Sequence, residues 1–324
     1  MKGRAPRVTV AVLAIVLALV GCGGKTAHKP KITSTVRSGL APTPPARDGA
    51  YFGALVDPAN KQSLTGFERF LGRQVDIVHA YRSWDQPFPQ DGDAAVLAGG
   101  RYLMLSWNGV DTTAITSGEQ DKSIHQRAKA IKKIGKPILL RWQPDMDKPG
   151  LTSTVHSAVG YVAAWKHLRE IFHAEHVDNA AWAWCPTAQG FGDNAADYYP
   201  GDDQVDWLCA DAYPAAKTEY QDLSQVLKPF LSWAAARPRP IMIGEFGVPR
   251  SYGPRRAEWL RKAAQTLQNP QIKAVLYFDS DARGHGSDKR LQYSLAGDDA
   301  AMSAIRELAT SPFFNPRNVP VQSN

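Results

Sequence analysis

The chain has 324 residues, of which 44% are hydrophobic, so it is long enough and apolar enough to bury a sizeable core. Its net charge of +7 is concentrated at one end, because residues 1–50 carry eight of the 38 Lys and Arg but only one of the 31 Asp and Glu. The rest of the chain carries 30 of each sign, which argues against a nucleic-acid-binding surface on the folded part.

The N-terminal residues have the pattern of a secretory signal peptide. Basic residues within the first seven positions precede an apolar run, Val10–Val20, that is too short to span a bilayer comfortably. The following Gly21-Cys22 resembles the end of a bacterial lipoprotein signal, in which the cysteine is lipidated. We therefore expect removal of residues 1–21, a lipid anchor on Cys22, and a location on the outer face of the cell membrane. An ordinary signal peptide with a chance cysteine is the alternative.

Residues 22–50 are rich in Gly, Lys, Pro, Thr and Ala and lack a hydrophobic period, which predicts a disordered tether. Once Cys22 is acylated, Cys185 and Cys209 remain, and an oxidising compartment favours a disulfide between them. Two free buried thiols are the alternative. The histidines are scattered without a metal-ligand spacing, so we expect neither a metal nor a cofactor.

The body of the chain alternates apolar strand candidates with amphipathic helical segments, of which Ala158–His173 is the longest. This alternation predicts one (β/α)8 barrel, a TIM barrel, over residues 51–318, followed by a tail at 319–324. No G-x-G-x-x-G or phosphate-binding loop follows the first strand, which argues against a dinucleotide-binding fold. The predicted strands are Tyr51–Val56, Val75–Tyr81, Tyr102–Trp107, Pro137–Trp142, Ala180–Cys185, Trp207–Ala212, Pro240–Glu245 and Ala274–Asp279.

Barrel enzymes carry their chemistry at the C-terminal ends of the strands. At those ends this chain interleaves carboxylates with aromatic residues, a combination that binds sugars through stacking and hydrogen bonds to hydroxyl groups. A purely structural role in the core is the alternative for each tryptophan. The residues predicted to bind substrate are Trp84, Trp107, Trp142, Trp184 and Asp279.

Two carboxylates are predicted to be catalytic, because glycoside hydrolysis needs one acid and one nucleophile or base. Glu245 ends a buried apolar strand, where a carboxylate needs partners or a chemical role. Arg141 and Asp145 share one parity along the fourth strand, so both are expected to point into the barrel. There Arg141 would hold a nearby carboxylate ionised. The alternative is a structural ion pair of Arg141 with Asp145 or Glu245.

Four motifs together resemble glycoside hydrolase family 26, the β-mannanase family, over roughly residues 50–315. They are P-I-L-L-R-W-Q-P-D-M-D at 137–147, A-W-A-W-C-P at 181–186, Y-Y-P-G-D-D-Q-V-D-W-L-C-A-D-A-Y at 198–213 and R-P-I-M-I-G-E-F-G at 239–247. The resemblance implies a (β/α)8 barrel with Glu245 as nucleophile and Tyr213 as a hydroxyl near it. Arg141 and Asp211 are expected to support Glu245.

This sequence departs from the family at the acid/base, because Pro144-Asp145 stands where the family has His-Glu. Asp145 is shorter than glutamate by roughly 1.5 Å, and a misplacement of about 1 Å can cost on the order of 100-fold in rate. Asp147 is a second candidate for the acid, although Asp145 occupies the family's position.

Three functions therefore compete. The first is a membrane-anchored glycosidase acting on a β-linked or arabinan-type polysaccharide, with Asp145 as acid/base. The second is a catalytically impaired barrel that binds glycans, and the third is a structural lipoprotein. We expect a monomer whose partners are an oligosaccharide or polysaccharide and, through the lipid anchor, the membrane, with no nucleic acid.

Overall fold

The computed structural model describes residues 1, 3, 41–57, 59, 63–282 and 287–322. The predicted signal peptide, Cys22 and the tether as far as residue 40 lie outside the described residues, apart from residues 1 and 3. No described helix is both long enough and apolar enough to cross a membrane.

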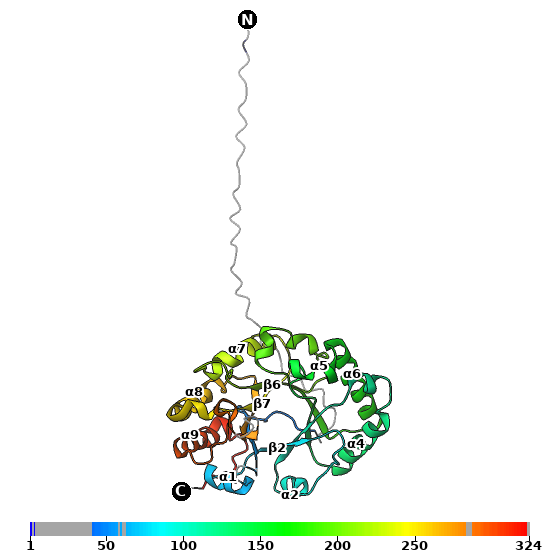
Figure 1. The fold of residues 1–324 in the computed structure, drawn as a ribbon. Helices are drawn as coiled ribbons and strands as arrows, with labels where there is room; N and C mark the ends of the chain where they lie inside the picture. The colour runs from blue at the N-terminus through cyan, green and yellow to red at the C-terminus, as the bar shows by residue number, and fades with distance from the viewer. Residues whose placement is uncertain (2, 4–40, 58, 60–62, 283–286, 323–324) are drawn as a thin grey trace. The chain divides into compact units, whose positions relative to one another are not determined.

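The described residues form a closed barrel of eight parallel strands, each paired with its neighbours in chain order, and β8 closes the ring by pairing with β1. Figure 1 shows the helices arranged around these strands. The predicted (β/α)8 architecture is confirmed. The strands are β1 Tyr51–Val56, β2 Ile77–Arg82, β3 Tyr102–Trp107, β4 Ile138–Trp142, β5 Ala180–Trp184, β6 Trp207–Ala212, β7 Ile241–Phe246 and β8 Ile272–Asp279.

The eight predicted strands are all present, and β1, β3 and β6 have the predicted bounds. The others differ by one or two residues at one or both ends. β4 and β7 each begin one residue after a proline, Pro137 and Pro240, because proline has no N–H to donate to a strand ladder.

The α-helices cover the outside of the barrel, and their caps follow from the sequence. At α1, Ser63 Oγ accepts a hydrogen bond from the backbone N–H of Gly66, and Gly72 ends the helix in the left-handed region at φ 72°. The α-helices are α1 Leu64–Leu71, α2 Asp93–Ala98, α3 Thr112–Thr116, α4 Asp121–Ile134, α5 Thr152–Val155, α6 Ala158–Ala174, α7 Leu223–Ala234, α8 Arg256–Thr266 and α9 Asp299–Thr310. Short 3₁₀ helices are η2 Pro149–Leu151, η3 Gln189–Gly192, η4 Ala195–Tyr198, η5 Arg250–Arg255, η7 Lys289–Leu291 and η8 Pro312–Phe314.

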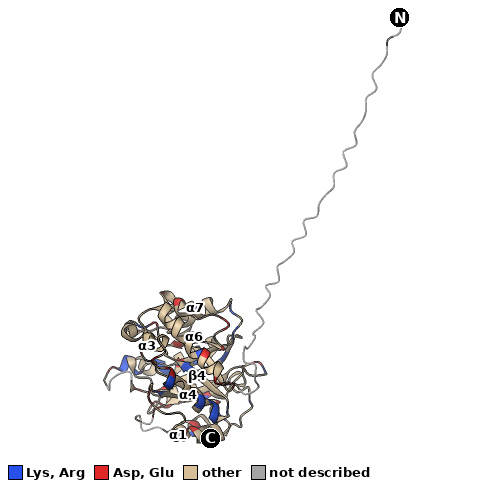
Figure 2. Cartoon of the chain, turned by 90° about the vertical axis from the view of Figure 1, so that its right-hand side faces the viewer, with Lys and Arg blue, Asp and Glu red and all other residues tan. Residues whose placement is uncertain are grey.

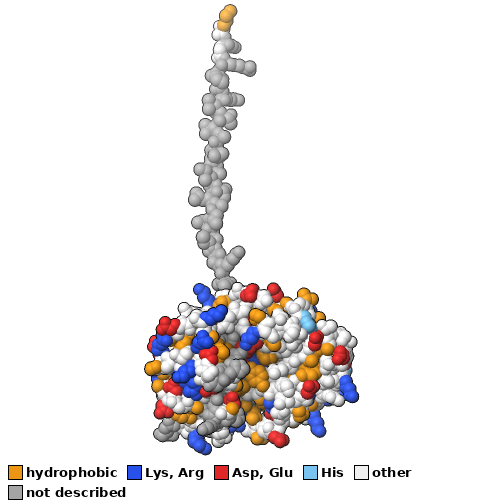
Figure 3. All heavy atoms as spheres, viewed as in Figure 1, with side chains coloured by type: hydrophobic (Ala, Val, Ile, Leu, Met, Phe, Trp, Pro, Cys, Tyr) orange, Lys and Arg blue, Asp and Glu red, His pale blue; other side chains and the backbone are white. Residues whose placement is uncertain are grey.

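Charged residues of both signs lie on the helices at the outside of the barrel (Figure 2), in line with the formal neutrality of the folded part. In the face shown in Figure 3, charged side chains surround the rim and hydrophobic side chains gather near the middle.

Residues next to both predicted domain boundaries pack against the barrel. Ala41 is buried in the apolar cluster inside the barrel, and Trp207 Nε1 donates a hydrogen bond to the carbonyl oxygen of Pro42 at 3.3 Å. At the other end, the N–H of Gln322 donates to the carbonyl oxygen of Gly72 at 2.7 Å. The packed region therefore begins before residue 51 and continues beyond residue 318.

The core has two shells. Alternate residues of each strand face inward, and their lower layer is apolar, with Met104, Leu139 and Met242 in one cluster. The residues between them face outward and pack against the helices in a larger cluster. Because the lower layer is filled with apolar side chains, polar groups inside the barrel are confined to its C-terminal half.

Candidate active site

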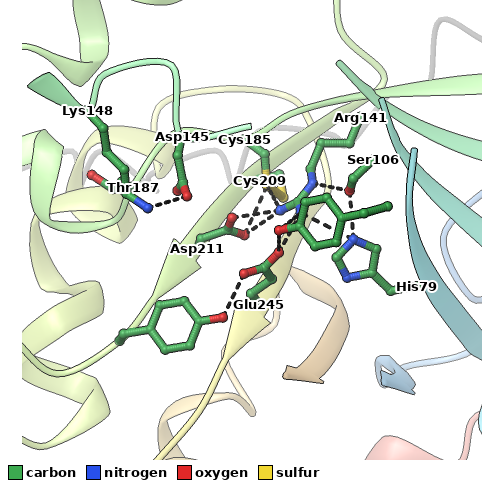
Figure 4. Close-up of polar contacts among 12 residues, drawn as sticks. His79, Ser106, Arg141, Asp145, Lys148, Cys185, Thr187, Cys209, Asp211 and Glu245 are labelled. Carbon is green, nitrogen blue, oxygen red and sulfur yellow. Dashed lines mark hydrogen bonds and ion pairs between the residues drawn. A yellow bond between two sulfur atoms is a disulfide. The ribbon is translucent and has the colours of Figure 1, made fainter. Parts of the chain in front are cut away.

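The inward-facing side chains change from apolar to polar toward the C-terminal ends of the strands. Five polar side chains from five different strands meet there, and all are at most 4% exposed. Figure 4 shows them pointing toward one another. They are His79, Ser106, Arg141, Asp211 and Glu245.

Arg141 of β4 is the centre of this network. A fully buried guanidinium is costly unless its charge and its N–H groups are matched. Nη1 of Arg141 donates to both carboxylate oxygens of Asp211 at 2.7 Å, and Nη2 donates to Oε1 of Glu245 at 2.5 Å. Nε donates to Oγ of Ser106 at 2.6 Å. One cation thus pairs with two carboxylates inside the barrel.

Glu245 is held by groups on both of its carboxylate oxygens. Oε1 accepts from Arg141 and from the hydroxyl of Tyr81, while Oε2 accepts from the hydroxyl of Tyr213 at 2.6 Å. The side chain is 0% exposed. These contacts fix the carboxylate in one orientation, and they place Tyr213 beside Glu245 as the sequence resemblance implied.

A β-bulge brings Glu245 to the inside of the barrel. Met242 faces inward, so strict alternation would point Gly244 inward and Glu245 outward. Instead the pairing of β6 with β7 shifts by one residue, from Ala210 opposite Ile243 to Asp211 opposite Glu245. Gly244 is the extra residue of the bulge. The shift places the Glu245 and Asp211 carboxylates on the same guanidinium.

His79 and Tyr81 of β2 complete the network in neutral forms. Burial and the Arg141 cation lower the pKa of His79 to about 3, so its imidazole is neutral at pH 7. Ser106 Oγ accepts from Arg141, which leaves the Ser106 hydroxyl to donate to Nε2 of His79 at 2.7 Å. Burial and the Glu245 charge raise the pKa of the Tyr81 phenol, so it stays a hydrogen-bond donor.

Sequence reasoning missed His79, Tyr81 and Ser106. Their position in the strand was the available signal, because His79 and Tyr81 face the same side of β2 as the inward-facing Ile77. Ser106 shares the inward parity of Met104 in the same way.

Asp145 does not join this network through Arg141. β4 ends at Trp142, and both Gln143 (φ 44°) and Asp145 (φ 57°) have left-handed backbone conformations, so the predicted strand alternation does not reach Asp145. Oδ2 of Asp145 instead forms an ion pair with Nζ of Lys148 (Figure 4). Such conformations cost roughly 1–3 kcal/mol and are found most often at functional sites.

Asp145 and Lys148 form part of the wall of two hollows at the barrel mouth. One hollow, of about 560 Å³, is also lined by Tyr81 and Asn108. The other, of about 450 Å³, is also lined by Tyr213. Asp145 is therefore positioned where a bound ligand would contact it.

Asp147, the second candidate for the acid, lies in the same loop after β4, but its carboxylate is bound by Thr187. Its Oδ1 accepts from the N–H of Thr187 at 2.9 Å and its Oδ2 from the Thr187 hydroxyl at 2.5 Å. Burial raises the pKa of Asp147, while the Thr187 donors act in the opposite direction. Asp147 thus ties the loop after β4 to the loop after β5, and it does not line either hollow.

The tryptophans predicted to bind sugar are located elsewhere, and we correct that prediction. Trp107, Trp142 and Trp184 are each 0% exposed, because their parity points them outward between the strands and the helices. Trp142 stacks on Tyr161 of α6, with ring centroids 5.1 Å apart. Trp84 is 8% exposed and stacks on Trp107 at 4.3 Å. A sugar cannot stack on these rings in this structure.

Asp279, also predicted to bind substrate, faces away from the site as well. Its Oδ1 accepts from the N–H of Leu295 at 2.7 Å, and burial raises its pKa to about 6. The aromatic side chains that do surround the mouth pack beside one another: Tyr81, Tyr213, Phe278 and Tyr293. Of these, Tyr81 lines the first hollow, and Tyr213 and Tyr293 line the second.

The predicted disulfide between Cys185 and Cys209 is present. It lies directly below the ion pairs, with Cys185 Sγ 3.5 Å from Oδ1 of Asp211 and 3.6 Å from Nη1 of Arg141. The two sulfurs and Asp211 are close enough together to hold a metal ion, but the bond between the sulfurs occupies them. The disulfide forms the floor of the site.

Residues 105–259 match the family model of glycosyl hydrolase family 26. This segment contains Arg141, Asp145, Asp211, Tyr213 and Glu245, the catalytic and supporting residues named from the sequence. The chain is also 28% identical over 291 residues to endoglucanase H of Acetivibrio thermocellus, covering 83% of this chain and 31% of that protein. It thus spans about a third of the length of this curated relative.

Two solved structures with the same fold have little sequence identity to this chain. A modular endo-β-1,4-mannanase from Cellulomonas fimi aligns with a TM-score of 0.61 at 16% identity, over 82% of this chain and 71% of that one. GH26C from Muricauda sp. MAR_2010_75 aligns with a TM-score of 0.63 at 15% identity, over 86% of this chain and 91% of that one.

Proposed function

We propose that this protein is a glycoside hydrolase that cleaves a polysaccharide internally, because residues 105–259 match the family model of glycosyl hydrolase family 26. The observation that carries the proposal is the environment of Glu245. This carboxylate is buried, ion-paired with Arg141 and oriented by two tyrosine hydroxyls at the mouth of the barrel. A carboxylate fixed in this way beside ligand-sized hollows is arranged for attack on a sugar carbon.

The proposed roles follow the two-carboxylate mechanism. Glu245 attacks the anomeric carbon as nucleophile, and Asp145 gives a proton to the departing oxygen and later takes one from water. Arg141 holds the charge of Glu245, and Asp211 holds Arg141 in place through both carboxylate oxygens. Tyr213 keeps Oε2 of Glu245 in position.

A β-linked glycan is the substrate class that the relatives support. Endoglucanase H and the endo-β-1,4-mannanase of Cellulomonas fimi are named for acting on such polymers. In this chain the sugar would lie against Tyr81, Tyr213 and Tyr293, which line the hollows at the mouth. We propose that the protein acts as a monomer, which light scattering tests directly.

Replacement of the nucleophile tests this function. Release of reducing ends from β-mannan, glucomannan, β-glucan and xylan is measured for the parent protein and for Glu245→Ala. We expect the variant to lose at least 100-fold in kcat, roughly 2.7 kcal/mol in barrier height. Glu307→Gln is the matched control, because it removes a half-exposed glutamate that pairs with Arg261 on the outer helices. Equal turnover by Glu245→Ala and the parent would exclude the role of Glu245.

One observation favours a second function, a barrel that binds glycans without cleaving them. Asp145 is shorter than the family's glutamate, and its Oδ2 is engaged by Lys148. If the parent binds oligosaccharides but releases no product, and Asp145→Glu gains hydrolysis, this second function holds. If the parent is active and Asp145→Asn is not, Asp145 is the acid/base.

We also propose that Cys22 carries the lipid anchor and that the barrel lies on the outer face of the cell membrane. The proposal is supported by the N-terminal sequence pattern and by the disulfide, because disulfides persist mainly in oxidising compartments. Expression of the full chain with Cys22→Ser in a bacterium that processes lipoproteins should move the protein from the membrane fraction to the soluble fraction. Retention of Cys22→Ser in the membrane would contradict the anchor.

A further inference from the structure

Lys148 and Asp145 form an ion pair at the mouth of the barrel, beside the proposed reaction centre. They are three positions apart in the loop after β4. The Asp145 side chain is 11% exposed and that of Lys148 is 41% exposed, so the ammonium is the more accessible of the two groups. A ligand arriving from solvent therefore meets Lys148 before Asp145.

This pair belongs to the walls of both hollows described above. Among the described residues that line these hollows, Lys148 is the single cation. The remaining charged residue there is Asp211, which is paired with Arg141 inside the barrel. A glycan that lies along both hollows passes over one ammonium group, and that group determines which charges on the glycan are tolerated.

The ion pair conflicts with the role proposed for Asp145. A general acid must place a carboxyl oxygen at the departing oxygen, and Lys148 holds Oδ2 of Asp145 instead. A bound group that replaces Asp145 as the partner of Lys148 removes this conflict. Hydroxyl groups of a neutral sugar are poorer replacements, because they carry no net negative charge to attract the ammonium as the Asp145 carboxylate does.

We propose that Lys148 is a specificity-determining residue and that the glycan bound here carries carboxylate groups, as a polymer containing uronic acids does. On binding, a sugar carboxylate takes the place of the Asp145 carboxylate at Nζ of Lys148. Oδ2 of Asp145 is then released from Lys148 and can face the leaving oxygen. The catalytic part of this inference rests on the proposed function, whereas the binding preference does not.

Calorimetry tests the preference without turnover, using the full chain with Glu245→Gln. The ligands are neutral β-1,4-linked manno- and gluco-oligosaccharides and the same compounds oxidised at C6 to carboxylates. We expect the oxidised forms to bind about tenfold more tightly, equivalent to roughly 1.4 kcal/mol. The preference should weaken as salt is added, because Lys148 is partly exposed.

Further variants in the Glu245→Gln background assign the preference to Lys148. Lys148→Met should abolish it and Lys148→Arg should keep it. Lys262→Met is the matched control, because Lys262 is 47% exposed and pairs with Glu258 on α8, outside the barrel mouth. Equal affinity for both ligand types, no binding of either, or a preference that survives Lys148→Met would overturn the proposal.

Turnover with Glu245 intact separates this inference from the proposed function. Lys148→Met should lower the ratio of kcat/KM on the oxidised polymer to kcat/KM on the neutral polymer about tenfold. A binding preference without any product would support the role of Lys148 and exclude the proposed hydrolysis. Hydrolysis of neutral polymers with no preference for the oxidised ones would support the proposed enzyme activity and exclude the role of Lys148.

Discussion

Replacing Gly244 with alanine should damage both the stability and the activity of this protein. Gly244 is the extra residue of the bulge that turns Glu245 into the barrel. A Cβ atom at this position would lie 2.6 Å from Sγ of Cys209, 2.7 Å from Sγ of Cys185 and 2.9 Å from Oδ1 of Asp211. The site therefore has no room for a single methyl group.

The size of the effect follows from these distances. Optimal contacts between non-bonded heavy atoms lie at about 3.5–4.0 Å, so the surroundings must move by roughly 1 Å. Neither neighbour gives way easily, because the sulfurs are bonded to each other and Asp211 is held by Arg141. Overpacking of this kind costs about 1–3 kcal/mol of folding free energy. A shift of about 1 Å in catalytic groups costs on the order of 100-fold in rate.

Urea unfolding and steady-state kinetics measure the two effects. Gly192→Ala is the matched control, because a Cβ there meets nothing within 4 Å and its backbone is not left-handed. We expect Gly192→Ala to stay within about 0.5 kcal/mol of the parent. If Gly244→Ala were as stable and as active as Gly192→Ala, the bulge would not position Glu245 as argued.

A double-mutant cycle tests the cause of the damage. Replacing Cys185 and Cys209 by alanine removes the two sulfurs nearest to the new methyl group. Gly244→Ala should therefore be less destabilising in that background than in the parent. Additive effects would show that the clash with the sulfurs is not responsible.

Three further predictions follow from the site and its floor. Tyr213→Phe removes the donor to Oε2 of Glu245 and should lower kcat by about 10- to 100-fold with little change in KM, measured by steady-state kinetics; a change in KM alone would place Tyr213 in substrate binding instead. Asp279 has its pKa raised by burial to about 6, so its stabilising contribution is present below pH 4 and is lost as pH rises through 6. Relative to the parent, Asp279→Asn should thus gain on the order of 3 kcal/mol in unfolding free energy between pH 4 and pH 8, and a pH-independent difference would contradict the raised pKa. Cleaving the Cys185–Cys209 bond, whose cysteines are 24 residues apart, should cost about 3.5 kcal/mol of stability, measured by urea unfolding of the parent and of Cys185→Ala/Cys209→Ala; equal midpoints would contradict the contribution of the disulfide.

The architecture could be predicted because it depends on local patterns. Apolar runs such as Trp207–Ala212, ended by turn residues and separated by helical periods, specify strand–helix alternation before any long-range contact is known. The site could be predicted in part for the same reason. Asp211, Tyr213 and Glu245 were found because parallel strands bring their C-terminal ends to one face of a barrel.

The tryptophans show where this reasoning fails. Their sequence positions place them near strand ends, but a one-residue difference in parity separates Trp107 and Trp142 on the outside from Ser106 and Arg141 on the inside. The prediction that Asp145 points inward with Arg141 relied on strand alternation. The left-handed backbone after β4 ends that alternation before Asp145.

By itself, then, the sequence determined the (β/α)8 fold and the disulfide pair and pointed to Glu245 as a candidate nucleophile, because composition, periodicity and strand-end position are local properties. Only the tertiary structure decided which groups surround that carboxylate. Tyr81 reaches it from a strand more than 160 residues away, and Lys148 rather than Arg141 pairs with Asp145. The contacts of Glu245 depend on a bulge at Gly244 and on barrel closure, and both are set by the packing of strands that are distant in the chain.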